Sequence, residues 1–352
     1  MKFSSFIVLS LFLTISASAQ SGRRKPSPTP TPKAINGPSV NNVPPQPVTT
    51  TPTPKAADKI DPEDIIKVDS VLVPIPVSVL EREGRAVTNL KLADFELKID
   101  GKAVEITDVA RSDTPIRLAM LFDNSSSVTI AREFEKDAAV RFFRRVIRPD
   151  KDKAALFSVA DYTRLEQALT SDVSQLTQAI ELFPPPKGAT ALLDGITEVA
   201  EYLKSSNGRR VVVIVSDGED TYSDLKTTLE GVVRSLQIND CQVYVVKTKD
   251  FENFKRTGLR GGNANIRALT AERRMIELAE QTGGAVYSPI DEEEMKQAFD
   301  RISAELSQQY ILSYYPEDEA QKPGEFRTIS LTVKDKPNMT IRTRKGYYVG
   351  RK

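Results

Sequence analysis

Residues 116–127 read Ile-Arg-Leu-Ala-Met-Leu-Phe-Asp-Asn-Ser-Ser-Ser, an apolar run that ends abruptly in one acid, one amide and three serines. A short apolar run of this kind is typical of a buried strand. Beyond the serines, apolar residues recur at four-residue spacing from Ile130 to Val146, which predicts an amphipathic helix. The segment is therefore read as a strand, a polar loop and a helix. In open α/β sheets, ligands gather at such carboxyl ends of strands.

Two distant segments carry matching oxygen donors. Thr190 closes the loop sequence Gly188-Ala189-Thr190, and Asp217 ends an apolar run that begins at Val211. The candidate metal ligands are thus two carboxylates and three hydroxyls, on Asp123, Ser125, Ser127, Thr190 and Asp217. Such a set suits a hard divalent cation, Mg²⁺ or similar, and suits zinc or copper poorly.

The composition excludes several classes of enzyme, because the 352 residues contain no histidine and one cysteine. A Ser-His-Asp or Cys-His nucleophile and a His-ligated or four-cysteine zinc site cannot be assembled. A serine activated by lysine stays possible for Ser125 or Ser127. The single cysteine, Cys241, opens a predicted strand and is interpreted as a buried free thiol, with a reactive or intermolecularly paired thiol as the alternative.

The N-terminal region has the features of an exported protein. Residues 1–19 combine Lys2, an apolar core at 6–15 and the small residues of 17–19, a pattern typical of a cleaved secretory signal peptide. No apolar stretch reaches the roughly 20 residues of a transmembrane helix. Basic and acidic side chains nearly balance, 49 against 48, so no nucleic-acid partner is implied. We expect a secreted or periplasmic protein without a transmembrane segment.

Residues 20–58 are rich in proline and threonine and lack the apolar side chains of a packed core. They are predicted to form a disordered linker that holds the folded region away from an envelope surface. The alternative is a tail without a task.

From residue 116 the pattern alternates between short apolar strands and helices, which predicts an α/β fold: a Rossmann-like, doubly wound, mostly parallel sheet. Two of the strands are separated by too few residues for a crossover helix and should form an antiparallel hairpin at one edge. Ser171, Ser223 and Asp291 are expected to cap later helices. The predicted strands are 116–122, 154–160, 164–169, 211–216, 242–248 and 285–288.

The segments on either side of this region have β character. Asp100-Gly101 is typical of a hairpin turn. We expect strands from both flanks to form one accessory β-sandwich-like domain into which the α/β domain is inserted. These flanking strands are predicted at 68–80, 95–99, 104–109, 310–315, 327–334 and 340–348. The predicted boundaries are 61–112 for the N-terminal β segment, 113–306 for the α/β domain and 307–352 for the C-terminal β segment.

Three short sequences carry a resemblance to the von Willebrand factor type A (VWA) domain. They are 123–127, the loop 188–190 leading into Ala-Leu-Leu-Asp-Gly, and Val215-Ser216-Asp217-Gly218. The flanks resemble more narrowly the secreted bacterial VWFA-related group. One departure is visible: Ser126 stands where the family usually carries glycine.

The resemblance implies a metal-ion-dependent adhesion site (MIDAS). Ser125, Ser127 and Thr190 would be hydroxyl ligands of Mg²⁺ (or Mn²⁺ or Ca²⁺), and Asp123 and Asp217 would bind the ion directly or through water. The implied function is a non-enzymatic binding module for cell adhesion or other protein–protein interaction. Its protein partner would supply an Asp or Glu carboxylate.

Two other functions stay open from the sequence. One is a structural envelope protein whose ion stabilises the fold, and the other is a metal-dependent hydrolase, because metal-bound water can be activated without histidine. Two further acids, Glu219 and Asp220, follow the last ligand. They are interpreted as solvated loop acids, with a second ion site as the alternative.

Overall fold

A computed structural model describes residues 72–260, 265–316 and 322–350 of the chain. The predicted signal peptide and linker, with the start of the N-terminal β segment, lie outside the described residues. Among the helices in the described part, none combines the length and apolar character that crossing a membrane requires.

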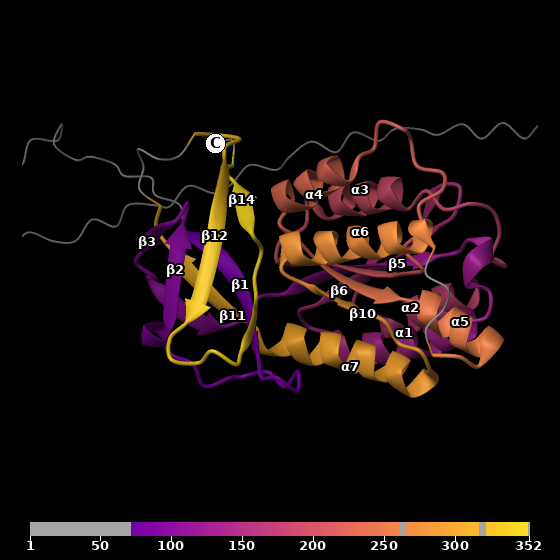
Figure 1. The fold of residues 1–352 in the computed structure, drawn as a ribbon, viewed down its shortest axis with the longest axis horizontal. Coiled ribbons are helices and arrows are strands. Elements are labelled where there is room, and N and C mark those ends of the chain that lie inside the picture. Colours follow the sequence, from indigo (N-terminus) through magenta and orange to yellow (C-terminus); the bar gives the residue numbers. More distant parts are fainter. Residues whose placement is uncertain (1–71, 261–264, 317–321, 351–352) are drawn as a thin grey trace, which may run out of the picture. The chain divides into compact units, whose positions relative to one another are not determined.

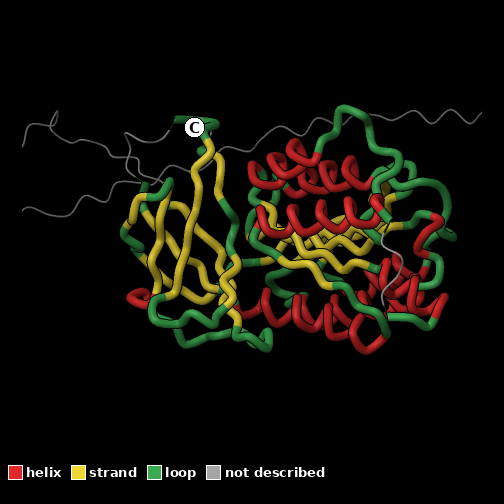
Figure 2. The backbone as a smooth tube through the Cα atoms, in the orientation of Figure 1, coloured by secondary structure: helices red, strands yellow, loops and turns green. Residues whose placement is uncertain are grey.

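The central sheet has six strands in the order β10-β9-β8-β5-β6-β7. Figure 2 shows its strands between helices. All neighbours are parallel except β6 and β7, which form the antiparallel edge hairpin predicted from the sequence. The strands are β5 (Ile116–Asp123), β6 (Lys153–Val159), β7 (Thr163–Thr170), β8 (Arg209–Ser216), β9 (Cys241–Lys247) and β10 (Ala285–Tyr287).

Helices cover both faces of this sheet (Figure 1). Alternate side chains of β5 divide between two apolar cores: Met120 contributes to one face and Leu121 to the other. One face packs against α1 (Arg132–Val146), α2 (Val173–Glu181), α5 (Lys249–Thr257) and α7 (Glu292–Gln308). The other packs against α3 (Leu192–Leu203), α4 (Leu229–Ile238) and α6 (Ile266–Thr282). The predicted doubly wound α/β architecture is confirmed.

The flanking strands form two four-stranded sheets, in the orders β13-β1-β11-β4 and β14-β12-β2-β3. Each sheet contains strands from both flanks, and one apolar core contains side chains of both sheets, as expected for a β-sandwich. The strands are β1 (Val73–Leu80), β2 (Phe95–Ile99), β3 (Lys102–Val104), β4 (Asp108–Arg111), β11 (Tyr310–Tyr314), β12 (Phe326–Val333), β13 (Thr340–Arg342) and β14 (Gly346–Tyr348).

Two predicted strands are each two strands in the structure. The segment 104–109 divides between β3 and β4, and 340–348 divides between β13 and β14, with the two halves in different sheets. Apolar side chains continue through the crossing, as buried Ile106 illustrates, so the sequence pattern does not reveal the corner. The hairpin turn at Asp100-Gly101 is confirmed: both residues have positive φ, and β2 pairs antiparallel with β3.

The α/β domain is inserted between two strands that lie side by side. Arg111 of β4 pairs with Tyr310 of β11, and β11 begins two residues after α7 ends. None of the three apolar cores found in the described ranges combines side chains of the sandwich with those of the α/β domain.

The junction between the two domains contains several buried polar contacts. Gln309 accepts a hydrogen bond from Arg209 and donates to Ser78 Oγ and Gln242 Oε1, at 3.0 Å each. Close by, Arg342 of β13 donates to Glu305 Oε2 of α7 at 2.6 Å. Glu305 is buried, and its other oxygen accepts from Tyr244 at 3.1 Å. The sandwich is therefore joined to α7 and β9 by directional bonds.

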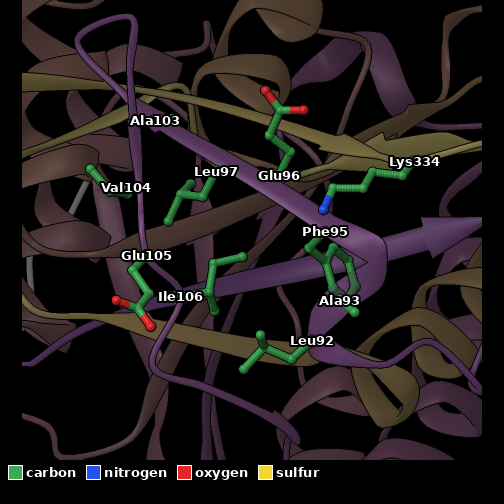
Figure 3. A pocket seen from close by; sticks show the side chains of 10 residues that line it. All are labelled: Leu92, Ala93, Phe95, Glu96, Leu97, Ala103, Val104, Glu105, Ile106 and Lys334. Atoms are coloured by element: carbon green, nitrogen blue, oxygen red, sulfur yellow. The ribbon is translucent and has the colours of Figure 1, made fainter.

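A hollow of about 220 Å³ lies on the sandwich (Figure 3). Seven of the ten residues that line it are apolar, among them Leu92, Phe95, Leu97 and Ile106. None of the five candidate metal ligands contributes to it.

Candidate metal-binding site

The candidate ligands lie at the carboxyl edge of the central sheet, where the predicted polar loops leave it. Asp123 is the last residue of β5, and Asp217 follows the last residue of β8. These two strands are parallel neighbours, paired through Phe122 and Val215, so their carboxyl ends emerge side by side. Thr190 lies two residues before the start of α3. Three different loops therefore supply the set.

The side chain of Asp123 is fixed by two short hydrogen bonds. Its Oδ1 accepts the backbone N–H of Ser125 at 2.9 Å, and its Oδ2 accepts the hydroxyl of Ser216 at 2.7 Å. The Oγ atoms of Ser125 and Ser127 lie 2.9 Å apart. Ser125 and Asp123 are buried, whereas Ser127 is exposed. The first loop thus presents a rigid carboxylate and two adjacent hydroxyls with one open side.

The loop that carries Thr190 is hydrogen-bonded to the first loop. The N–H of Lys187 donates to Asn124 O at 2.9 Å, and the N–H of Ser126 donates to Gly188 O at 3.3 Å. The hydroxyl of Ser126 donates to the same carbonyl at 3.2 Å. The serine that replaces the family's usual glycine therefore links the two loops.

Glycine is required at position 188. Its φ is +86°, and a Cβ there would lie 2.6 Å from Oδ1 of Asp161. That same oxygen accepts the N–H of Ala189 at 2.6 Å. The close approach holds the Thr190 loop against the turn between β6 and β7.

Asp217 has an unmet acceptor. Its Oδ1 accepts the N–H of Glu219 at 3.0 Å, but within the described residues its buried Oδ2 accepts no hydrogen bond. The nearest positive group is Lys249 Nζ at 3.7 Å, beyond hydrogen-bond distance, because this ammonium donates to Glu219 Oε1 at 2.9 Å. An unmet buried carboxylate oxygen is costly unless a cation balances it.

The electrostatics of Asp123 lead to the same conclusion. Burial, and then the charge of Asp217, raise the pKa of Asp123 to about 6. Two buried carboxylates with mutual repulsion are a pair that a divalent cation would stabilise. Across the described ranges no three side chains of His, Cys, Asp or Glu are placed together to hold a metal ion, and the other donors of this set are hydroxyls. The residues present fit a hard cation, and ion binding itself stays a prediction.

The two acids after Asp217 have structural roles. Asp220 Oδ1 accepts the N–H of Leu193 at 3.3 Å and the hydroxyl of Ser223 at 2.6 Å, which holds the start of α3. Glu219 pairs with Lys249. The interpretation of both as solvated acids was therefore wrong, because each has a partner that lies far away in the sequence or on a neighbouring helix.

Two of the three predicted helix caps are displaced. Thr228, not Ser223, caps α4, and Ser223 Oγ accepts the N–H of Asp194 in the first turn of α3. Asp172, next to the predicted Ser171, caps α2. The third cap, Asp291, is confirmed.

Cys241 is buried at the start of β9, as the sequence predicted. Burial raises the pKa of its thiol to about 12. The thiolate that a nucleophile requires is therefore disfavoured.

Two buried acids behind the site gave no signal in the sequence. Glu252 of α5 accepts the N–H groups of Ile130 and Ala131, at 2.8 and 2.7 Å, and so fastens α5 to the start of α1. Glu135 of α1 is 1% exposed, and its Oε1 accepts no hydrogen bond in the described part of the chain. Burial, followed by the charges of Asp123 and Glu252, raises the pKa of Glu135 well above its ordinary value.

Glu135→Gln is expected to stabilise the metal-free protein at pH 8. A buried acid with a raised pKa favours folding while it is protonated, so the wild type loses stability as the pH rises above the unfolded value of 4.5. Glutamine carries no charge to lose. Urea unfolding in chelator should show a gain of about 1–3 kcal/mol at pH 8, the range for an unmet buried polar group, and none at pH 4.

The matched control is Glu133→Gln, at an exposed position on the same helix. Its change in the free energy of unfolding, relative to wild type, should be the same at both pH values. A gain for Glu135→Gln that is the same at pH 4 and pH 8 would contradict the explanation.

The comparisons with known proteins give one family match. A model of the von Willebrand factor type A domain matches residues 118–301, more than half of the chain. No curated protein matches the sequence.

Several solved structures are similar at low identity. The von Willebrand factor type A protein from Catenulispora acidiphila is 10% identical over 81% of this chain and 76% of its own, with a TM-score of 0.44. The PilB minor pilin from Streptococcus sanguinis is 13% identical over 57% of this chain, with a TM-score of 0.42. The match spans 63% of that pilin, less than two thirds of its length. An aerotolerance-related membrane protein from Bacteroides fragilis is 19% identical over 54% of this chain and 98% of its own, with a TM-score of 0.40.

Proposed function

Because the chain belongs to the von Willebrand factor type A domain family, whose domains are generally protein-interaction modules, we propose that it binds a protein partner through a divalent cation. Asp123, Ser125, Ser127, Thr190 and Asp217 would hold the ion, which is Mg²⁺ or a similar hard cation. When bound, the ion supplies a positive centre that attracts a carboxylate of the partner. We further propose that the protein acts outside the cytosol, because residues 1–19 have the pattern of a signal peptide.

The observation that carries this proposal is the unmet oxygen of Asp217 beside the buried carboxylate of Asp123. Asp217 Oδ2 accepts no hydrogen bond in the described residues, and the pKa of Asp123 is raised by burial and by that neighbouring charge. Natural structures rarely leave a buried carboxylate oxygen without a hydrogen bond, and the ammonium of Lys249, 3.7 Å away, is shared with Glu219. A cation between the two carboxylates would satisfy both.

The remaining donors suit partner binding. Three of the five donors, the hydroxyls of Ser125, Ser127 and Thr190, are neutral, so the bound ion would stay electrophilic and open to a further ligand. Ser127 is exposed, so a partner can approach the set there. An Asp or Glu of the partner would complete the site better than neutral water does.

Partner binding is expected to require both the ion and Thr190. The purified protein should capture its partner from an envelope extract, and chelator should abolish this capture. Thr190→Ala should weaken binding of the captured partner by about 2 kcal/mol or more, since contacts at a desolvated centre dominate binding energy. Calorimetry with that partner would measure the loss.

Thr332→Ala, at an exposed position on β12, is the matched control and should leave affinity unchanged. If the partner keeps its affinity in chelator and against Thr190→Ala, the ion is structural, and the protein is an envelope component with a stabilising ion.

A further inference from the structure

Exposed aromatic side chains are concentrated at the candidate site. In the described part of the chain three aromatic residues are exposed: Tyr162 at 65%, Tyr222 at 62% and Tyr315 at 55%. The first two lie in loops at the carboxyl edge of the central sheet, and the third follows β11 in the sandwich. Tyrosine is the residue type that protein interfaces favour as an anchor.

Hydrogen bonds attach both tyrosines to the Thr190 loop. The N–H of Tyr222 donates to Thr190 O at 3.0 Å. On the other side, Ala191 N donates to Ala160 O at 2.7 Å, and Ala160 N donates to Tyr162 O at 3.2 Å. Tyr222 is therefore bonded to the proposed ligand Thr190, and Tyr162 is linked through Ala160 to Ala191, the residue after that ligand.

The loop that carries Tyr222 is rigidly held. Asp194 of α3 accepts the N–H of Asp224 at 2.8 Å and the hydroxyl of Thr227 at 2.5 Å. Asp220 accepts the hydroxyl of Ser223. An aromatic side chain on a fixed backbone loses little entropy on binding, so its exposed surface is available for affinity.

The charges around the site give no reason for the partner to carry more than one acid. Two exposed acids, Asp161 and Asp224, and two exposed bases, Lys187 and Lys226, lie on the same set of loops. Glu219 and Lys249 neutralise one another. A partner with a run of acids would gain nothing beyond the one carboxylate at the ion.

We propose that Tyr162 and Tyr222 form an aromatic contact surface that recognises apolar side chains next to the partner's acid. This inference rests on the proposed function and names its ligand class. The partner segment is a protein loop with a single Asp or Glu flanked by aromatic or aliphatic residues. The ion binds the acid, and the two rings cover the flanking side chains.

Three cyclic peptides of equal length test the inference. Each carries one central Asp, flanked by Phe and Leu, by Gly, or by further Asp residues. With the full chain in Mn²⁺, fluorescence polarisation should show that the apolar-flanked peptide binds roughly tenfold tighter than the other two, as expected for aromatic anchors.

The double variant Tyr162→Ala/Tyr222→Ala should remove this tenfold preference and leave the affinity for the Gly-flanked peptide unchanged. Tyr162→Phe/Tyr222→Phe should retain the preference, because the rings make the contact. Tyr315→Ala removes a tyrosine of similar exposure from the sandwich; it is the matched control and should change nothing. Unaltered melting temperature and Mn²⁺ affinity would show that the variants fold.

Equal affinity for the three peptides, no binding of any of them, or a preference that survives Tyr162→Ala/Tyr222→Ala would overturn the inference. Failure of the proposed function gives a different result. The apolar-flanked peptide would then bind with the same affinity in chelator as in Mn²⁺, and the protein's preference for it would still depend on the two tyrosines.

Discussion

Replacing Asp123 with alanine should lower the affinity for Mn²⁺ or Mg²⁺ by more than roughly 100-fold, which corresponds to about 2.7 kcal/mol. The variant removes one of the two carboxylates that would bind the ion. It also removes the acceptor that fixes the N–H of Ser125 and the hydroxyl of Ser216. Isothermal titration calorimetry on the full chain measures the loss directly.

The fold should survive Asp123→Ala, because the variant also relieves the repulsion that raises the pKa of this acid. A thermal melt in chelator checks this. Asp137→Ala removes an exposed acid from α1 and is the control for a general loss of negative charge. Calorimetry that gives the same ion affinity for Asp123→Ala and wild type would refute the assignment of the site.

Replacing Arg342 with methionine should destabilise the protein by about 3 kcal/mol, the lower end of the range for breaking a buried ion pair. The lower end applies because the arginine side chain is 26% exposed, whereas its partner Glu305 is 2% exposed. The methionine would leave the Glu305 carboxylate buried at the junction without its 2.6 Å partner. Urea unfolding at pH 7 measures the change.

A double variant separates the charge from the packing. Arg342→Met/Glu305→Gln should recover much of the lost stability, because no buried charge is then left alone. The comparison is Arg145→Met, which breaks an exposed ion pair between α1 and Asp300. Asp300 lies on α7, as Glu305 does, and this variant should lower stability by at most about 1 kcal/mol. Equal costs for Arg342→Met and Arg145→Met would show that the junction pair has no special role.

Much of the central sheet could be predicted from the sequence because its strands are buried on both faces. A strand such as β8 is a continuous apolar run, which the sequence displays directly. The ends of the sandwich strands could not be predicted in the same way. Segments 104–109 and 340–348 keep their apolar character while the chain crosses between sheets, and only the partner strands fix where each half ends.

The positions of the five candidate ligands could be predicted because polar residues at the ends of apolar runs are visible in the sequence. Their environment could not. Glu135 looks like a solvent-facing residue of an amphipathic helix, and its burial depends on how α1 packs against α5 and the sheet. Lys249 and Asp220 likewise find their partners only through tertiary contacts.

The pairing of Arg111 with Tyr310 has a mechanical consequence. Tension applied before β1 and after β14 is borne by the strands of the sandwich, where β1 lies between β11 and β13 and β14 is paired with β12. The two points at which the chain leaves and rejoins the sandwich are adjacent, so the load need not pass along the chain through the α/β domain while β4 and β11 stay paired. The metal-site loops would keep the same geometry in a stretched molecule as in a relaxed one.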